Sequence, residues 1–251
     1  MASRRRLGAE LIRRELADDD EAARSLIESD RVLVNGAVAS NPWRLVAAAD
    51  AVVIVTPAPF VSRGGEKLDH ALDAFAVDVA GRRWLDAGAS TGGFTDCLLQ
   101  RGAASVVALD VGHGHLHPML RDDARVTVIE RRHVRDVQPD ELGGLVAGVV
   151  ADLSFISLRL VIAPLVCLCQ PGAPMVLLVK PQFEASRAEA NAGRGVITDP
   201  QVHRRVRSEI DAVLVGHGCT VIAWTDSPIT GAEGNRELFV HAATPALEHE
   251  P

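Results

Sequence analysis

The sequence contains very little lysine. Only two of its 26 lysine and arginine residues are lysines, Lys67 and Lys180. Arginine can serve wherever positive charge alone is needed, but it stays protonated, whereas a lysine amine can have its pKa moved by its surroundings. The two lysines are therefore candidates for sites that need an amine.

Cysteine is also scarce, and its four occurrences form no CxxC pair. This spacing suggests no small disulfide framework, so we expect a protein of the reducing cytoplasm. The basic N-terminus is not followed by a continuous apolar stretch, so we expect no signal peptide. The formal net charge of -7 argues against a chain built wholly to bind polyanions, although local basic clusters remain possible.

One apolar segment, residues 160–179, has about the length that spans a bilayer. Its middle reads "QPGAP", and two prolines around a glycine are typical of a helix end, a turn and a new strand. We therefore expect a buried helix followed by a buried parallel strand, and no contact with a membrane.

The first part of the chain, residues 4–56, predicts a small α+β module. Two amphipathic helices are followed by "RVLVNG", a strand that runs into an Asn-Gly turn, and by a further strand in "DAVVIVTP". The Pro- and Gly-rich residues 57–66 are interpreted as a linker. Residues 67–244 then form the main domain, which begins with a helix over 68–81.

In the main domain, short apolar strands alternate with helices, including helices at 158–170 and 199–217. This alternation predicts an α/β fold, a doubly wound parallel sheet with helices on both faces. The last two strands are separated only by a loop, which favours an antiparallel hairpin at one edge. The loop at 184–197 is rich in Gly and Ala and favours a mobile segment that orders on binding a substrate.

The stretch "WLDAGASTGGFTD", residues 84–96, predicts a strand, a glycine-rich turn and a helix start. It lacks the lysine of a phosphate-binding GxxxxGK[ST] loop and the spacing of a GxGxxG dinucleotide motif. Asp86 stands just before the turn, and Asp110 ends the next strand. A carboxylate there disfavours a pyrophosphate but suits an ammonium, and S-adenosyl-L-methionine offers an ammonium, a ribose and no phosphate. The residues of the turn favour this cofactor over another nucleotide ligand, and over a purely structural role in packing.

Four ionisable residues should meet at the carboxyl edge of the sheet. Lys180 and Asp152 each end a buried strand, Glu237 leads the last strand, and Lys67 follows the linker. Ligands bind at this edge in open α/β sheets. The sequence therefore predicts two amines and two carboxylates in one site.

The order Lys67, Asp152, Lys180, Glu237 resembles the K-D-K-E tetrad of FtsJ-type 2'-O-ribose methyltransferases. The segments "VSRGGEKL", "LDAGASTGGFT", "VVADLSFISL" and "LVKPQFE" resemble the TlyA family. The N-terminal module with "RVLVNG" is similar to the S4 RNA-binding domain that this family carries. The resemblance covers roughly residues 4–243. It implies a Rossmann-like methyltransferase sheet and methylation of cytidine 2'-hydroxyls in ribosomal RNA of the small and possibly the large subunit.

The resemblance also implies roles for single residues. Lys180 takes or holds the proton of the 2'-hydroxyl, and Asp152 orients the Lys180 amine. Glu237 positions Lys67. Contacts to S-adenosyl-L-methionine are expected from Asp86, Gly88, Ala89, Ser90, Thr91, Gly92, Gly93, Phe94, Asp110, Glu130, His133 and Asp152. Contacts to ribosomal RNA or ribosomal subunits are expected from Arg4, Arg6, Arg13, Arg24, Arg31, Asn35 and Arg44.

Four alternatives compete with these interpretations. The alternating His113, His115 and His117 could bind a metal on a strand, but a turn with exposed histidines is favoured, and no metal is expected. A cysteine nucleophile is not expected, since Cys167 and Cys169 fall in the apolar 158–170 helix as buried thiols. Instead of an enzyme, the chain could be a membrane-active haemolysin or a non-catalytic ribosomal RNA-binding assembly factor.

Overall fold

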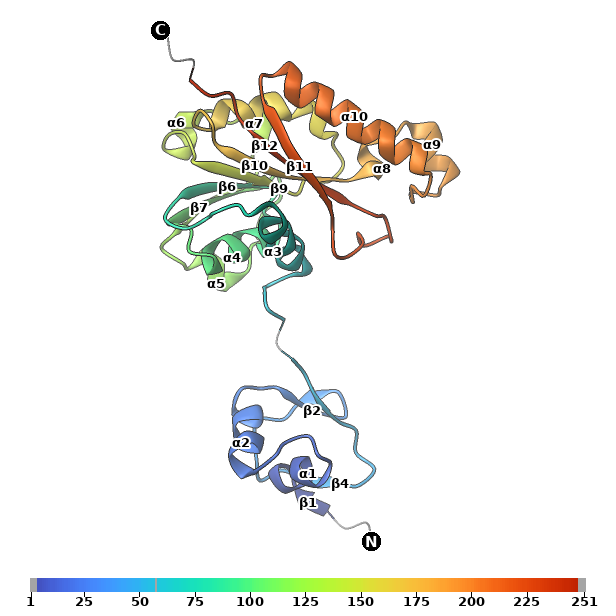
Figure 1. Ribbon diagram of the computed structural model, residues 1–251. Helices are drawn as coiled ribbons and strands as arrows, with labels where there is room; N and C mark the ends of the chain where they lie inside the picture. Colours follow the sequence, from blue (N-terminus) through green and yellow to red (C-terminus); the bar gives the residue numbers. More distant parts are fainter. Residues whose placement is uncertain (1–3, 57, 248–251) are drawn as a thin grey trace. The chain divides into compact units, whose positions relative to one another are not determined.

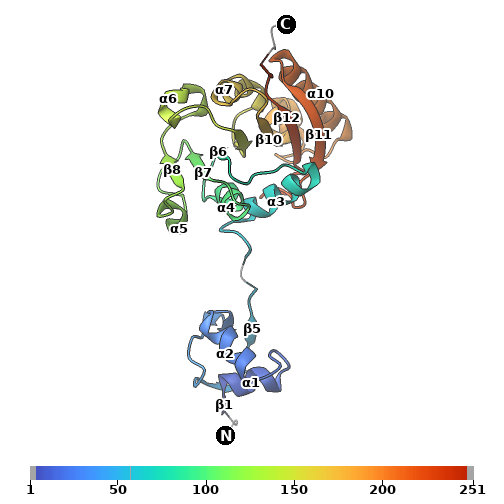
Figure 2. The same cartoon turned by 60° about the vertical axis from the view of Figure 1, so that its left-hand side comes forward.

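The computed structural model describes residues 4–56 and 58–247. The chain divides into two compact units between Ala58 and Pro59. Figure 1 and Figure 2 show an N-terminal unit of short helices and strands and a larger unit in which helices cover a twisted sheet.

The N-terminal unit packs two helices on two small sheets. Its elements are β1 (Arg4–Arg6), α1 (Leu7–Arg13), α2 (Asp20–Glu28), β2 (Val32–Val34), β3 (Ala37–Val38), β4 (Leu45–Ala47) and β5 (Val52–Ile54). Asp19 caps α2 by accepting a hydrogen bond from the Ala22 amide. The predicted hairpin is confirmed: β2 pairs antiparallel with β3 and β5. Asn35 and Gly36 both adopt the positive φ that a two-residue hairpin turn requires.

One element of this unit was not predicted. The arginines at 4–6 precede a helical pattern, but they form strand β1, paired antiparallel with β4. The helix starts only at Leu7, where the buried spacing of Leu7 and Leu11 begins. A pairing between segments forty residues apart leaves no local signal in three arginines.

The larger unit is built on a seven-stranded sheet. Its strands are β6 (Arg83–Ala87), β7 (Ser105–Leu109), β8 (Val126–Ile129), β9 (Gly148–Ala151), β10 (Pro174–Val179), β11 (Thr220–Asp226) and β12 (Leu238–Ala243). The order is β11-β12-β10-β9-β6-β7-β8. Strands β6 to β10 are parallel, and β12 runs antiparallel to both of its neighbours. The predicted α/β fold and the antiparallel hairpin at one edge are confirmed.

Helices cover both faces of this sheet, as Figure 1 shows. They are α3 (Arg63–Phe75), α4 (Gly93–Gln100), α5 (Pro118–Arg121), α6 (Pro139–Leu142), α7 (Ile162–Leu168), α8 (Pro181–Glu184), α9 (Arg187–Ala192) and α10 (Pro200–Gly216), with 3-10 turns η1 (Val134–Asp136) and η2 (Leu158–Leu160). Apolar residues of α3, α4 and α5 form one core cluster with the sheet, and those of α7 and α10 form the other. The buried strands therefore sit between two apolar layers.

The expected linker at 57–66 is wrong at its C-terminal end. Helix α3 already begins at Arg63, and the segment before it is held on α4, where the carboxylate of Asp96 accepts the Val61 amide at 2.8 Å. The helix expected over 68–81 ends at Phe75, because Ala76 turns into the left-handed region and β-branched Val77 and Val79 follow.

The apolar segment 160–179 forms α7 and the buried strand β10, as expected. In the described part of the chain, no helix is long and apolar enough to cross a membrane. The expectation of a continuous loop at 184–197 is wrong, since residues 187–192 form α9. Ser186 and Glu189 form a capping box for α9, and Arg205 of α10 binds Glu189 at 2.7 Å. Polar capping and an ion pair order a segment whose small residues suggested mobility.

Candidate active site

The glycine turn after β6 lies at the centre of the carboxyl edge, where β6 is flanked by β7 and β9. Gly88 has a φ of +91°, and a Cβ there would stand 2.5 Å from the carbonyl oxygen of Asp152. A Cβ on Gly93 would stand 2.8 Å from the amide nitrogen of Gly65 in α3. Only glycine permits these two approaches, which bring β9 and α3 against the turn.

The four predicted catalytic residues line one cavity of about 360 Å³. The Lys67 ammonium lies 2.6 Å from Glu237 Oε2, and the Lys180 ammonium lies 2.6 Å from Asp152 Oδ1. Lys180 also donates a hydrogen bond to the Ser154 hydroxyl at 2.9 Å. We call this space the tetrad cavity. It holds two lysine–carboxylate pairs, as the sequence predicts.

Each member of the tetrad comes from a different element. Lys67 lies in the first turns of α3, Lys180 follows β10, Asp152 follows β9, and Glu237 precedes β12. Lys67 and Glu237 are buried, while Asp152 and Lys180 are partly exposed. As side chains, however, Lys67 and Lys180 are equally exposed, at 11% each, so Asp152, at 23%, is the member most open to a substrate.

A second cavity of about 730 Å³ extends along the ends of β6 and β7, and we call it the strand-end cavity. Asp110 and His133 line it, and it shares Gly88, Ser90 and Asp152 with the tetrad cavity. The carboxylate of Asp110 accepts the Ser90 amide at 2.8 Å and the Gly112 amide at 2.6 Å. Asp110 thus braces the glycine turn while facing the cavity. Two spaces that join at Asp152 suit two reactants.

Asp86 lies beneath the turn and lines neither cavity. It is fully buried and accepts a hydrogen bond from the Thr95 hydroxyl at 2.6 Å. Its other oxygen, Oδ1, is buried without a hydrogen-bond partner among the described residues. Burial raises the pKa of Asp86 to about 7, against the hydrogen bonds from Thr95. A cationic group of a ligand would satisfy this carboxylate.

Glu130 does not line the strand-end cavity. Its carboxylate binds Arg121, accepts the Gly114 amide at 2.9 Å and contacts the His113 ring at 2.7 Å. These partners, Arg121 first, lower its pKa to about 2. Glu130 therefore holds the turn at 113–117.

The three histidines of this turn are exposed, as the favoured interpretation has it. His117 caps α5, and only His115 lines the strand-end cavity. Within residues 4–56 and 58–247, no group of three potential ligands is arranged to hold a metal.

An aromatic pair beside Lys180 was missed by sequence reasoning. Phe155 is 92% exposed, has a φ of +63° and lines the strand-end cavity. Its ring lies 5.3 Å from that of Phe183, and the Lys180 ammonium lies 5.9 Å from the Phe183 ring. A phenylalanine held outward in a strained backbone is a functional signal, but the sequence does not reveal its exposure.

The predicted RNA-binding residues fall into two groups. Arg4 and Arg6 are exposed, and their register opposite Ala47 and Leu45 puts them on one face of the β1–β4 ribbon. The Arg6 guanidinium lies 4.6 Å from the ring of Trp43, which is 62% exposed. Arg44 is partly exposed in the same segment. Trp43 is an aromatic neighbour that the sequence reasoning missed.

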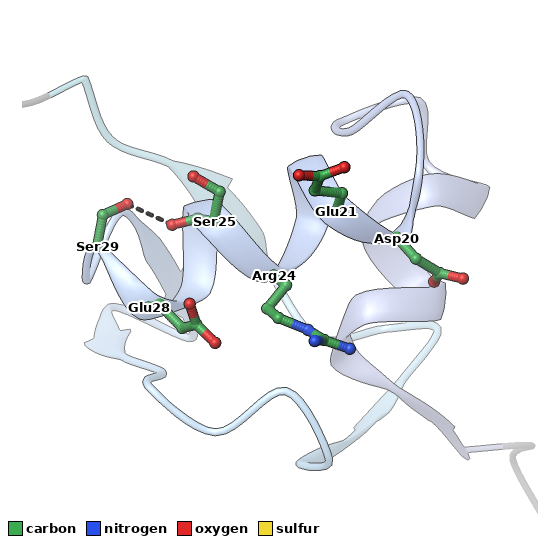
Figure 3. Close-up of a pocket in the computed structure, with 6 residues that line it drawn as sticks. All are labelled: Asp20, Glu21, Arg24, Ser25, Glu28 and Ser29. Atoms are coloured by element: carbon green, nitrogen blue, oxygen red, sulfur yellow. Dashed lines mark hydrogen bonds between the residues drawn. The ribbon is translucent and has the colours of Figure 1, made fainter.

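The remaining candidates have structural partners or acidic neighbours. Arg13 binds Glu10, Arg31 donates to the Val55 carbonyl, and Asn35 bonds with Asp50. Arg24 lies in a surface depression of about 780 Å³ along α2, shown in Figure 3. The depression is lined by Asp20, Glu21, Arg24, Ser25, Glu28 and Ser29. Three carboxylates around one arginine disfavour a phosphate there.

The cysteine prediction was half wrong. Cys169 is buried, and burial raises its pKa to about 12, but Cys167 is exposed on the outer side of α7. An apolar stretch does not reveal which of its positions faces solvent. Neither cysteine lines the tetrad cavity.

Comparisons with known proteins agree with this geometry. The FtsJ-like methyltransferase family matches residues 60–244. The 16S/23S rRNA (cytidine-2'-O)-methyltransferase TlyA of Mycobacterium tuberculosis is 46% identical over 97% of this chain and 91% of its own length. This chain belongs to the TlyA family. Its larger unit is the FtsJ-like methyltransferase domain of that family.

Two solved structures show the likeness in three dimensions. A hemolysin-named protein of Streptococcus thermophilus is 34% identical to this TlyA-family chain, with a TM-score of 0.73 over 98% of the chain and 90% of its own. The N-methyltransferase NodS of Bradyrhizobium japonicum, solved with S-adenosyl-L-homocysteine, shares the fold alone. It is 15% identical, with a TM-score of 0.51 over 73% of this chain and 86% of its own.

Proposed function

We propose that this protein uses S-adenosyl-L-methionine to methylate the 2'-hydroxyl of cytidine in ribosomal RNA. The observation that carries the proposal is the tetrad cavity, where two lysine–carboxylate pairs meet beside a second, larger cavity. A ribose hydroxyl needs alignment and help in losing its proton, and these groups can supply both.

The residues around the strand-end cavity fit the cofactor. Asp110 can accept hydrogen bonds from ribose hydroxyls, and the segment around His133 can flank the adenine. The unpartnered oxygen of Asp86 supports the prediction that it balances the amino-acid ammonium, acting through water or across the turn because Asp86 itself lines neither cavity. When bound, the cofactor supplies an electrophilic methyl group. Glu130 is the least supported contact, because its oxygens already have three partners.

Lys180 is the residue we assign to the reacting hydroxyl. Asp152 and Ser154 hold its ammonium from one side, at 2.6 Å and 2.9 Å. Lys180 acts on the hydroxyl as the neutral amine, after its ammonium has given one proton to solvent. It takes the hydroxyl proton as the 2'-oxygen bonds to the methyl group, whose former bonding pair would stay on the sulfur of the cofactor. Lys67, held by Glu237, adds a second positive charge in the same cavity and favours the deprotonated oxygen.

We assign RNA contact to the N-terminal unit as an S4-like domain. Arg4 and Arg6 supply charge for phosphates, and exposed Trp43 supplies a ring on which an unpaired base can stack. Near the tetrad cavity, exposed Phe155 can stack on a base of the substrate.

The relative's name gives both 16S and 23S RNA, so we expect both subunits to be substrates. Ribosomes as partners would place the enzyme in the cytoplasm.

Methyl transfer by Lys180 variants tests the proposal. We expect Lys180→Ala to lower the single-turnover rate on ribosomal RNA about 10²- to 10⁴-fold. Lys180→Arg keeps the charge but cannot exchange the proton, so it should be similarly impaired. Affinity for S-adenosyl-L-methionine, measured by calorimetry, should stay within a few-fold. A normal rate in either variant would refute the role of Lys180. Tight RNA binding without methyl transfer by the wild-type chain would favour an assembly factor instead.

A further inference from the structure

A separate cavity of about 520 Å³ lies beside the N-terminal half of α10, and we call it the α10 cavity. Residues of α10, of the segment before it and of the β11–β12 hairpin line it. Among them are Arg204, Arg207, Asp226, Arg236 and Leu238. It shares no lining residue with the tetrad cavity or the strand-end cavity.

The α10 cavity is positively charged. Three arginines and one carboxylate line it, and the carboxylate is already used, because Asp226 Oδ2 binds Arg236 at 2.6 Å. Within residues 4–56 and 58–247, no carboxylate pairs with Arg204 or Arg207. This excess of positive charge occurs in a chain with a net charge of -7.

One of the free arginines is held in place by an aromatic ring. The Arg207 guanidinium lies 5.0 Å from the centre of the Trp224 ring. The Trp224 indole nitrogen in turn donates a hydrogen bond to Asp211 at 2.9 Å. The attraction between the guanidinium and the ring face draws the side chain toward Trp224 while leaving its hydrogen-bond donors free. An oriented fork without a protein carboxylate suits a phosphate.

The α10 cavity is next to the tetrad across one strand. Leu238 lines the cavity, and Glu237, the preceding residue, belongs to the tetrad. Glu237 directly precedes β12 and Leu238 begins it, so the two cavities lie on either side of the start of this strand. Leu238 also pairs with Val179, the residue before Lys180.

We infer that the α10 cavity binds a backbone phosphate of the substrate RNA, close in the strand to the nucleotide whose ribose lies at Lys180. This inference rests on the proposed function for its substrate. Arg204 and Arg207 neutralise the phosphate. The RNA strand passes over the β11–β12 loop, in which Gly231 and Ala232 line the tetrad cavity and Gly234 and Arg236 line the α10 cavity. The site fixes the register of the RNA and reads no base.

Charge reversal tests the site. Arg204→Glu and Arg207→Glu are compared with Arg82→Glu, an equal charge change at an exposed arginine just before β6, at the amino ends of the parallel strands and away from both cavities. We measure the RNA dissociation constant at several salt concentrations, KM and kcat for RNA, and affinity for S-adenosyl-L-methionine. Arg204 and Arg207 are both exposed on α10, so both charge reversals should fold, and either one tests the site if the other does not.

We expect the RNA dissociation constant and the KM for RNA to rise about tenfold in both α10 variants. The slope of log affinity against log salt is negative, and it should become shallower by about 0.7 for each phosphate that the variant no longer neutralises. Affinity for S-adenosyl-L-methionine should be unchanged, which also shows that the variants fold, and Arg82→Glu should match the wild type. The inference is overturned if the α10 variants bind RNA as Arg82→Glu does while the wild type methylates it. If the α10 variants lose RNA binding but the wild type transfers no methyl group, the cavity stands and the proposed function fails.

Discussion

The ammonium of Lys67 lies 2.6 Å from the carboxylate of Glu237, although 170 positions separate the two residues in the chain. Both side chains are largely shielded from solvent. The pair ties α3, at the start of the larger unit, to β12, at its end. Because it borders the tetrad cavity, it contributes both to stability and to the charge felt by a substrate.

Removing one partner of this pair should separate the two contributions. Glu237→Gln leaves the Lys67 ammonium buried without a counter-ion, so the free energy of unfolding should fall by about 3 kcal/mol. The double variant Lys67→Met, Glu237→Gln leaves no buried charge and should regain most of that stability in urea unfolding. Although its stability is regained, this double variant should transfer methyl groups at least tenfold more slowly than the wild type. A double variant with normal activity would show that the pair is structural only.

The glycine turn can be tested by a matched pair of alanine substitutions. Both Gly88 and Gly81 have positive φ, but a Cβ at Gly81 meets nothing within 4 Å, whereas at Gly88 it stands 2.5 Å from the Asp152 carbonyl. Gly81→Ala should cost about 1 kcal/mol of stability and leave affinity for S-adenosyl-L-methionine unchanged. Gly88→Ala should weaken that affinity at least tenfold in calorimetric titration. Equal cofactor affinities in the two variants would count against a role for the turn.

Asp86 predicts a pH dependence of cofactor affinity. Its pKa of about 7, raised by burial, means that its neutral form is favoured in the folded protein at acid pH. The contribution of the protonated Asp86 carboxyl to the free energy of unfolding is fully present below about pH 4 and is lost as pH rises through 7. An ammonium ligand needs the ionised form, so affinity should rise about tenfold from pH 6 to pH 8 relative to Asp86→Asn. Because both proteins bind the same ligand, the effect of the titration of the ligand's own amine largely cancels in the ratio of the two dissociation constants. A ratio independent of pH would contradict the assignment.

The N-terminal unit offers two arginines with different surroundings. Arg6 lies beside Trp43 on the β1–β4 face, whereas Arg24 lies among Asp20, Glu21 and Glu28. Arg6→Ala should weaken binding to ribosomal RNA several-fold and lower its salt dependence. Arg24→Ala should bind as the wild type does in a filter assay. Equal losses from the two substitutions would reject the β1–β4 face as the RNA-binding surface.

Strand ends were the most predictable part of the site. Asp152 and Lys180 each follow a short run of buried apolar residues, and parallel strands end at one edge, so sequence position alone implied proximity. The lysine–carboxylate pairing was also predictable, because two amines and two carboxylates that share one cavity form ion pairs.

Other features depend on contacts that the local sequence does not encode. Strand β1 exists through pairing with β4, and α9 is ordered through Arg205 of α10. The exposure of Phe155 and of Cys167 depends on how turns and helices pack, and an apolar residue in an apolar context predicts burial by default. The α10 cavity joins segments around 200 and 236 that no motif connects.

The most direct test is transfer of labelled methyl groups from S-adenosyl-L-methionine to purified small and large ribosomal subunits, followed by mapping of the modified nucleotide. We predict label on the 2'-oxygen of a cytidine in each subunit, and none with Lys180→Ala. Label on a base, or no label on either subunit by a chain that binds the cofactor, would contradict the account.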